Sequence, residues 1–195
     1  MALAPGALAV LEDHERRVLG LVTVNPKSKI IARMLDRDPG AQIGADWFAQ
    51  RIGRALALRE RLYPAPFYRL VHAEADGLPG VIIDRFGDLA VIQPNAAWAE
   101  AHLAALAEAL VAVTGVARLV KNGSGRSRGL EGLAEETLVL RGAVDAPVPV
   151  AMNGATYMAD VTGGQKTGLF LDQRDQPAPE HLVAYLDGRS RGVGV

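Results

Sequence analysis

Apolar residues recur along this chain at two spacings, one typical of helices and one of strands. Residues 46–62 carry apolar side chains close to one helical turn apart, and Asp46 is suited to cap this helix. Residues 98–113 are rich in alanine and place leucines at helical spacing, which predicts a second helix packed on a sheet. The apolar positions of the two helices are Phe48, Ile52, Ala55 and Leu62, and Leu103, Leu106 and Leu110.

Short apolar runs separated by turn residues predict strands between and around these helices. Residues 80–85 and 89–93 flank Phe86-Gly-Asp, which predicts a β-hairpin. Residues 148–152 and 155–161 flank Asn153-Gly154, a strong hairpin turn signal. Strands and helices thus alternate, and the predicted fold is α+β.

Composition argues against a secreted or membrane protein and excludes any site that needs cysteine. The 195 residues are 49% hydrophobic and 22% charged, with a net charge of -1 and no cysteine. The length allows one or two domains with a real core. No signal peptide or run of about eighteen apolar residues occurs, so a cytoplasmic protein without membrane contact is expected. Without cysteine, the chain has no disulfide, cysteine-ligated metal or cysteine nucleophile of its own.

Charge is unevenly distributed, which favours nucleic-acid contact by the first part of the chain. Residues 1–70 hold 11 Lys and Arg against 7 Asp and Glu, whereas residues 71–195 hold 10 against 15. On the predicted helix, Arg51, Arg54 and Arg61 lie within about a quarter of the circumference, a geometry that could follow an RNA backbone. An ordinary solvated helix face is the alternative.

Two short basic segments are further candidates for RNA contact. Asn25-Pro-Lys-Ser28 predicts a turn that presents Lys27 and Ser28 at a strand edge, close to Lys29, Arg33 and Arg37. Residues 121–128 combine Lys121, Arg126 and Arg128 with small residues, so this predicted loop could wrap a phosphate backbone. The alternatives are a plain turn between strands and a flexible surface hairpin. No aromatic residue interleaves the basic ones of residues 121–128, so base stacking is not predicted in that segment.

One histidine and two acids, His72, Glu74 and Asp76, alternate in a way that could present metal ligands. No second histidine pair stands nearby, and residues 76–80 carry strong turn chemistry. A structural role is therefore favoured over a metal site, with Arg69 or Arg85 as candidate ion-pair partners for the acids.

Residues 164–174, G-Q-K-T-G-L-F-L-D-Q-R, concentrate polar and flexible residues directly after the second predicted hairpin. The segment lacks the spacing of a phosphate-binding loop, because Gln165 separates Gly164 from Lys166. It resembles instead the signature of bacterial class I S-adenosylmethionine-dependent 23S rRNA (cytosine carbon 5) methyltransferases. Residues 68–87 and the N-P-K-S-K-I-I-A-R block at 25–33 are similar to further segments of that family, in the same order.

This resemblance implies a domain organisation. It implies the end of a PUA-like RNA-binding β-barrel at 1–45, a linking helix at 46–66, and a central α+β domain with β-hairpins at 67–175. Residues 176–195 would begin the methyltransferase domain. The resemblance also implies an earlier part of the barrel and a C-terminal Rossmann domain, so the chain is expected to be truncated at both ends.

The resemblance implies that the 164–174 signature contributes to an S-adenosylmethionine site. Lys166 or Arg174 would meet the cofactor's carboxylate and Asp172 its ammonium. Phe170 would pack on its apolar part, while Gly168 allows close approach and Gln173 supplies an amide; Thr167 completes the expected set. An Asp172–Arg174 ion pair that stiffens the connection is the alternative.

The predicted function is that of part of an rRNA methyltransferase involved in rRNA processing, with ribosomal RNA as partner and a homodimer as a further expectation. Methylation of cytosine carbon 5 normally needs a thiolate that adds to carbon 6. The family places that nucleophile in the domain expected to be missing, so this chain alone is predicted to be inactive and to bind RNA. A stand-alone RNA-binding protein is one alternative, and a nucleotide-dependent enzyme using residues 164–167 is a weaker one.

Overall fold

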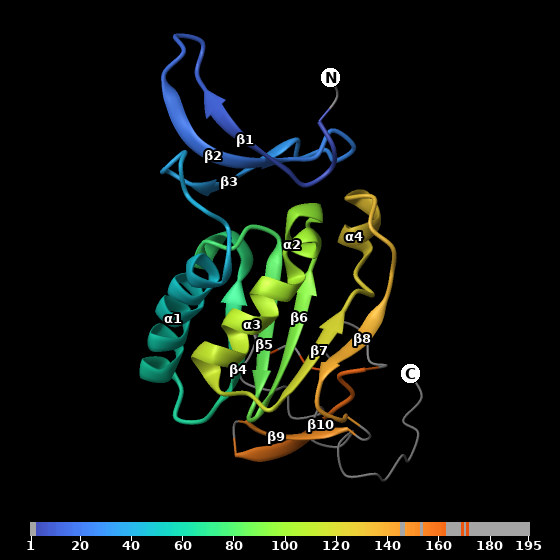
Figure 1. The fold of residues 1–195 in the computed structure, drawn as a ribbon. Helices are drawn as coiled ribbons and strands as arrows, with labels where there is room; N and C mark the ends of the chain where they lie inside the picture. Colours follow the sequence, from blue (N-terminus) through green and yellow to red (C-terminus); the bar gives the residue numbers. More distant parts are fainter. Residues whose placement is uncertain (1–2, 145–146, 153, 163–168, 170, 172–195) are drawn as a thin grey trace, which may run out of the picture.

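The computed structural model describes residues 3–144, 147–152, 154–162, 169 and 171. Three sheets and a small set of helices make up this part of the chain (Figure 1), which confirms the predicted mixture of sheets and helices. In chain order the elements are β1 (Ala7–Glu12), β2 (Val18–Val24), β3 (Ala32–Asp36), α1 (Ala45–Leu62), β4 (Phe67–His72), the 3-10 helix η1 (Ala73–Asp76), β5 (Val81–Phe86), β6 (Leu89–Pro94), α2 (Ala97–Ala101), α3 (Leu103–Thr114), β7 (Arg118–Asn122), α4 (Arg126–Leu130), β8 (Thr137–Arg141), β9 (Val148–Met152) and β10 (Ala155–Ala159).

The N-terminal unit is a three-stranded antiparallel sheet in the order β1-β2-β3. Partly buried and exposed residues alternate along β1, as expected for a strand with one covered face. Figure 1 shows this sheet seated on the end of the central domain where α2 and α4 lie. The complete barrel remains a prediction, since the described residues of this unit form these three strands.

The central sheet has the order β4-β5-β6-β7-β8 and is antiparallel except for the pair β6 and β7. The parallel pair is joined by α2 and α3, because parallel neighbours need a crossover connection. The predicted hairpin of residues 80–93 is confirmed as β5 and β6.

Both faces of the central sheet are covered, which explains why β6 reads as an almost continuous apolar run. Ala90 and Ile92 join the core beneath α1 and α3, whereas Leu89 and Val91 join a second core with β9 and β10. The hairpin predicted around Asn153-Gly154 is confirmed as β9 and β10. Successive residues of one strand thus serve two cores.

The helix of residues 46–62 is confirmed, with differences at its ends. Gly44 is the N-cap and Asp46 lies inside the first turn, so the prediction that Asp46 caps the helix was wrong. Phe48, Ile52 and Ala55 are buried, but Leu62 is 60% exposed because it is the last residue of the helix, where the chain turns away towards β4.

The predicted helix of residues 98–113 is two helices, α2 and α3, which meet at His102. His102 has φ -107° and ψ 16°, outside the helical region, and its Nδ1 lies 2.8 Å from the Trp98 carbonyl oxygen. In the described part of the chain, no helix is both long and apolar enough to cross a membrane.

Candidate nucleic-acid interface

The predicted turn at Asn25-Pro-Lys-Ser28 connects β2 to β3 and is held by its own polar groups. The Lys27 amide donates to Asn25 Oδ1 at 3.1 Å, and the Ser28 amide donates to the Asn25 carbonyl at 3.1 Å. The Ile30 amide donates to Ser28 Oγ at 3.2 Å. Asparagine and serine commonly close turns through such local bonds, so the prediction of a turn here is confirmed.

The side chains of this turn point in two directions. Asn25 and Ser28 are buried, at 5% and 9% exposure, whereas Lys27 and Lys29 are exposed. The turn therefore has an inner side that faces the central domain and an outer side that carries two cations.

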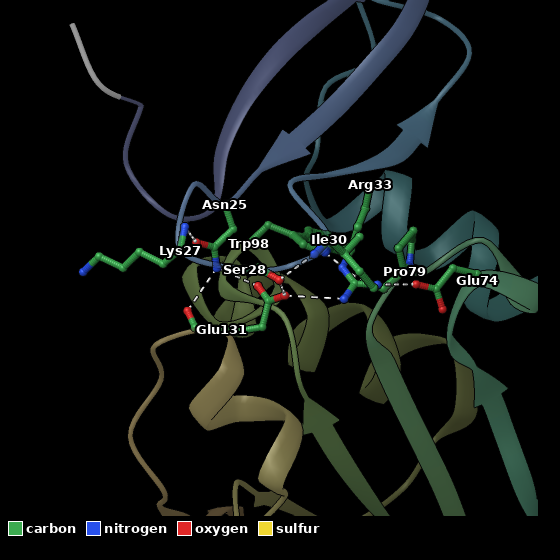
Figure 2. Close-up of polar contacts among 9 residues, drawn as sticks. All are labelled: Asn25, Lys27, Ser28, Ile30, Arg33, Glu74, Pro79, Trp98 and Glu131. Atoms are coloured by element: carbon green, nitrogen blue, oxygen red, sulfur yellow. Dashed lines mark hydrogen bonds and ion pairs between the residues drawn. The ribbon is translucent and has the colours of Figure 1, made fainter.

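Glu131, which directly follows α4, receives the inner side of the turn (Figure 2). Its Oε2 accepts from Asn25 Nδ2 at 2.7 Å, and its Oε1 accepts from Ser28 Oγ at 2.8 Å. Asn25 Nδ2 also lies 3.0 Å from the Glu131 carbonyl oxygen. Burial alone would raise the pKa of Glu131, but the bonds from Asn25 and Ser28 lower it below its ordinary value, so the group is ionised at neutral pH.

Arg33 extends this contact from β3. Its Nη2 lies 3.4 Å from Glu131 Oε1, and its Nη1 donates to Glu74 Oε1 at 2.7 Å. Arg33 thus spans the gap between α4 and η1, both in the central domain (Figure 2).

A second joint forms where β3 meets α1. Arg51 donates to Asp36 Oδ2 at 2.7 Å and to the Gly77 carbonyl at 3.1 Å, and its guanidinium lies 3.5 Å from the centre of the Trp47 ring. The Asp38 amide, the Trp47 indole and Arg51 all donate to Asp36 and lower its pKa to about 2. Arg51 therefore connects β3, α1 and the turn after η1.

The predicted basic loop of residues 121–128 is largely regular structure, and the description as a loop was wrong. Lys121 lies in β7, and Arg126 and Arg128 lie in α4. Lys121 Nζ and Arg128 Nη1 both bind Glu100, at 2.5 and 2.8 Å, and Arg128 also donates to two carbonyl oxygens, of Pro94 and Ala134. Each of the two cations is 2% exposed, so their charges are used inside the protein.

Exposed cations remain at four of the predicted RNA-binding positions: Lys27, Lys29, Arg54 and Arg126. A Cβ atom placed on Gly132, just beyond α4, would lie 3.8 Å from Lys27 Cδ, so the lysine stem crosses the end of α4. The junction of the two units thus brings the turn of Lys27 and Lys29 to the helix that carries Arg126. Arg54 is on α1, a separate element.

The acids of the His72 segment have arginine partners, although not Arg69 or Arg85. Asp76 accepts from Arg59 at 2.6 Å and from the His72 amide at 2.7 Å, and Glu74 pairs with Arg33. Within the described residues, no group of three or more potential metal ligands lies together.

The expected cofactor-binding positions lie outside the described residues: Lys166, Thr167, Gly168, Phe170, Asp172, Gln173 and Arg174. Two residues of the signature are described, and they are apolar. Leu171 is buried in the core beneath β9 and β10, and Leu169 packs against it. These two leucines therefore belong to the second core of the central sheet.

Glu131 was missed by the sequence analysis, although it receives donors from both the turn and Arg33. Its partners Asn25 and Ser28 lie more than 100 residues earlier in the chain. No local spacing connects the two segments, and Gly132 beside it signals only a turn.

Comparison with known proteins confirms the resemblance that the motifs indicated. A family model described as a PUA-like domain matches residues 1–37. The large-subunit rRNA methyltransferase I of Shewanella denitrificans is 40% identical over 169 residues, which are 85% of this chain and 43% of that protein. The protein of the same name from Cronobacter sakazakii is 34% identical over 180 residues, which are 88% of this chain and 44% of that protein. The chain therefore spans less than half the length of these relatives.

Two solved structures share the fold. A protein of Streptococcus mutans assigned as a SAM-dependent methyltransferase superposes with a TM-score of 0.75 at 18% identity, over 89% of this chain and 45% of that one. A second methyltransferase, complexed with SAH, has a TM-score of 0.74 at 18% identity and covers 88% of this chain and 44% of its own.

Proposed function

We propose that this chain takes part in the S-adenosylmethionine-dependent methylation of large-subunit ribosomal RNA. The observation that carries this proposal is 40% identity to an rRNA large subunit methyltransferase I over 85% of the chain. The PUA-like match at residues 1–37 and the methyltransferase fold of the structural neighbours support it. A function on ribosomal RNA implies a protein of the bacterial cytoplasm.

Within that function, the 195 residues serve RNA recognition. Lys27, Lys29, Arg54 and Arg126 are exposed and are suited to contact phosphate. Ser28, Arg33, Arg51, Lys121 and Arg128 support this surface from within, because their polar groups are engaged with Glu131, Asp36, Glu74 or Glu100.

The target atom we propose is carbon 5 of a cytosine. The thiolate that this reaction needs is not available among these residues, because the chain contains no cysteine. The nucleophile would come from outside this sequence, and the chain alone would not methylate RNA.

The cofactor is proposed to meet Lys166, Thr167, Gly168, Phe170, Asp172, Gln173 and Arg174. This part of the proposal is supported by the match to the family signature and by the structural neighbour complexed with SAH. A cation for the carboxylate and an anion for the ammonium are both present in the segment.

A second candidate is a stand-alone RNA-binding protein, which would need only the exposed cations Lys27, Lys29, Arg54 and Arg126. Calorimetric titration with S-adenosylmethionine separates the two when it compares a chimera that adds the remaining length of the Shewanella denitrificans relative with the same chimera carrying Asp172→Asn and Arg174→Gln. Only the methyltransferase proposal expects these substitutions to weaken binding. The methyltransferase proposal expects binding and RNA methylation by the chimera. A chimera that folds but neither binds the cofactor nor methylates large-subunit rRNA would contradict it.

RNA binding by the chain itself is measured with a large-subunit rRNA transcript and an unrelated RNA of the same length. The proposal expects tighter binding of the rRNA, with an affinity that falls as salt rises. Sedimentation velocity on the same sample tests the further proposal of a homodimer.

A further inference from the structure

A single buried carboxylate, that of Glu131, joins the N-terminal sheet to the central domain. Its two oxygens take hydrogen bonds from Asn25 and Ser28, and Arg33 Nη2 lies 3.4 Å from Oε1. In these contacts each neighbour donates, and an ionised carboxylate, which has two oxygens and no hydrogen, accepts from all of them.

The contact fixes the conformation of the Asn25–Ser28 turn as well as the position of the sheet. Asn25 and Ser28 bracket Lys27, and Ser28 precedes Lys29, so both lysines lie next to an anchored residue. With Asn25 and Ser28 drawn inwards by Glu131, Lys27 and Lys29 are left on the solvent side (Figure 2, where Lys27 points away from the cluster).

Close backbone packing beside this cluster agrees with a fixed joint. A Cβ atom on Gly6 would lie 2.9 Å from backbone atoms of Ala97 and Trp98, so the N-terminal unit touches α2 without room for a side chain. The Trp98 indole in turn donates to the Pro79 carbonyl at 2.9 Å, which ties α2 to the connection between η1 and β5.

We propose that Glu131 is a positioning residue for RNA: it locks the Asn25–Ser28 turn so that Lys27 and Lys29 meet phosphate together with Arg126. The inference rests on the proposed RNA-binding function. It assigns to an acidic residue a role that promotes the binding of an anion.

This role predicts a change in RNA affinity opposite to the one that removing a negative charge usually causes. Removing a negative charge close to a phosphate site should strengthen RNA binding if charge alone decides the affinity. Loss of Glu131 should weaken it instead, because the lysines lose their fixed placement. The two explanations therefore predict opposite changes for one substitution.

The test compares Glu131→Gln with Glu135→Gln, which removes the same charge from an exposed residue of the same connection between α4 and β8. Affinity for a fluorescent single-stranded RNA is measured at constant salt. We expect roughly fivefold weaker binding by Glu131→Gln. Complete loss of both lysine–phosphate contacts would weaken binding about 25-fold at 0.1 M salt, which is the upper limit. Glu135→Gln should bind as tightly as the wild type or more tightly. Unchanged or tighter binding by Glu131→Gln would overturn the proposal.

A second measurement, made without RNA, reports whether Glu131 fixes the N-terminal sheet on the central domain. Because the chain has no cysteine, His14→Cys in the β1–β2 connection and Glu108→Cys on α3 give two unique sites for spin labels. Both positions are exposed and can carry a label at the surface. The distance distribution should be narrow in the labelled protein that keeps Glu131 and broader in the one that also carries Glu131→Gln. An equally narrow distribution in both would count against the lock.

The two measurements keep this inference separate from the proposed function. If the wild type does not bind RNA but Glu131→Gln broadens the distance distribution, the RNA-binding function fails and the role in RNA positioning fails with it, while the joint itself stands. If the wild type binds RNA and Glu131→Gln changes neither readout, only the positioning role is lost.

Discussion

At the residue scale, a substitution of Gly6 tests the close packing of the N-terminal sheet on α2. Its effect on stability can be separated from that of backbone strain. The φ of +83° at Gly6 and its 2.9 Å approach to α2 both oppose a side chain. Gly115 has a similar φ of +67° but open space around it. We expect Gly115→Ala to lower the free energy of unfolding by about 1 kcal/mol through φ alone. Gly6→Ala should cost about 2–4 kcal/mol, since overpacking adds to the strain. Urea unfolding of both variants checks this, and equal losses would show that the close approach is unimportant.

Asp36 makes the N-terminal joint sensitive to acid. Its pKa of about 2 lies below the ordinary value of 3.8, so its bonds to the Asp38 amide, Trp47 and Arg51 stabilise the fold fully above about pH 4. That contribution, roughly 2 kcal/mol, is lost as the pH falls from 4 towards 2. We expect the stability difference between the wild type and Asp36→Asn to shrink over this window in urea unfolding. A difference that stays constant with pH would contradict this assignment.

Residue-level prediction from the sequence succeeded where chemistry is local and failed where it is not. Proline, which fixes φ, and asparagine, which tolerates turn geometry, predicted the turn at 25–28 from local chemistry alone. The sequence did not reveal that Ser28 faces inwards, because its partner Glu131 is 103 positions away.

At the element scale, α4 separates a structural arginine from a surface arginine two positions away. Arg128 is buried on Glu100, whereas Arg126 is exposed. Arg128→Met should lower the free energy of unfolding by about 3 kcal/mol, because it breaks a buried ion pair. Arg126→Met should change stability by less than about 0.5 kcal/mol but should weaken RNA binding. Thermal unfolding and RNA affinity, measured on both variants, check the two roles, and similar stability losses would contradict the distinction.

Elements with a clear period were predictable from sequence. The helix at 46–62 and both hairpins follow from apolar spacing and turn residues alone. The structure of residues 121–128 was not predictable, because glycine, serine and arginine in succession are typical of a solvated loop. Glu100 lies on α2, in the connection between the parallel strands β6 and β7, and it binds Lys121 and Arg128 inside the protein.

At the scale of the whole molecule, positive charge is concentrated in residues 1–70, while the remainder of the chain is acidic. Such asymmetry alone could attract RNA without any defined site. If the exposed turn makes the contacts instead, Lys27→Gln with Lys29→Gln should reduce the slope of log affinity against log salt by about 1.4 on single-stranded RNA.

Arg16→Gln with Arg141→Gln removes the same charge from exposed positions in the β1–β2 connection and on β8. Fluorescence anisotropy over a series of potassium chloride concentrations gives both slopes. A local site predicts that this control pair keeps the slope of the wild type, since neither residue would touch phosphate and each lies on a different element from the turn. Equal slope losses in the two double variants would mean that overall charge holds the RNA, and the assignment of Lys27 and Lys29 as contacts would then be wrong.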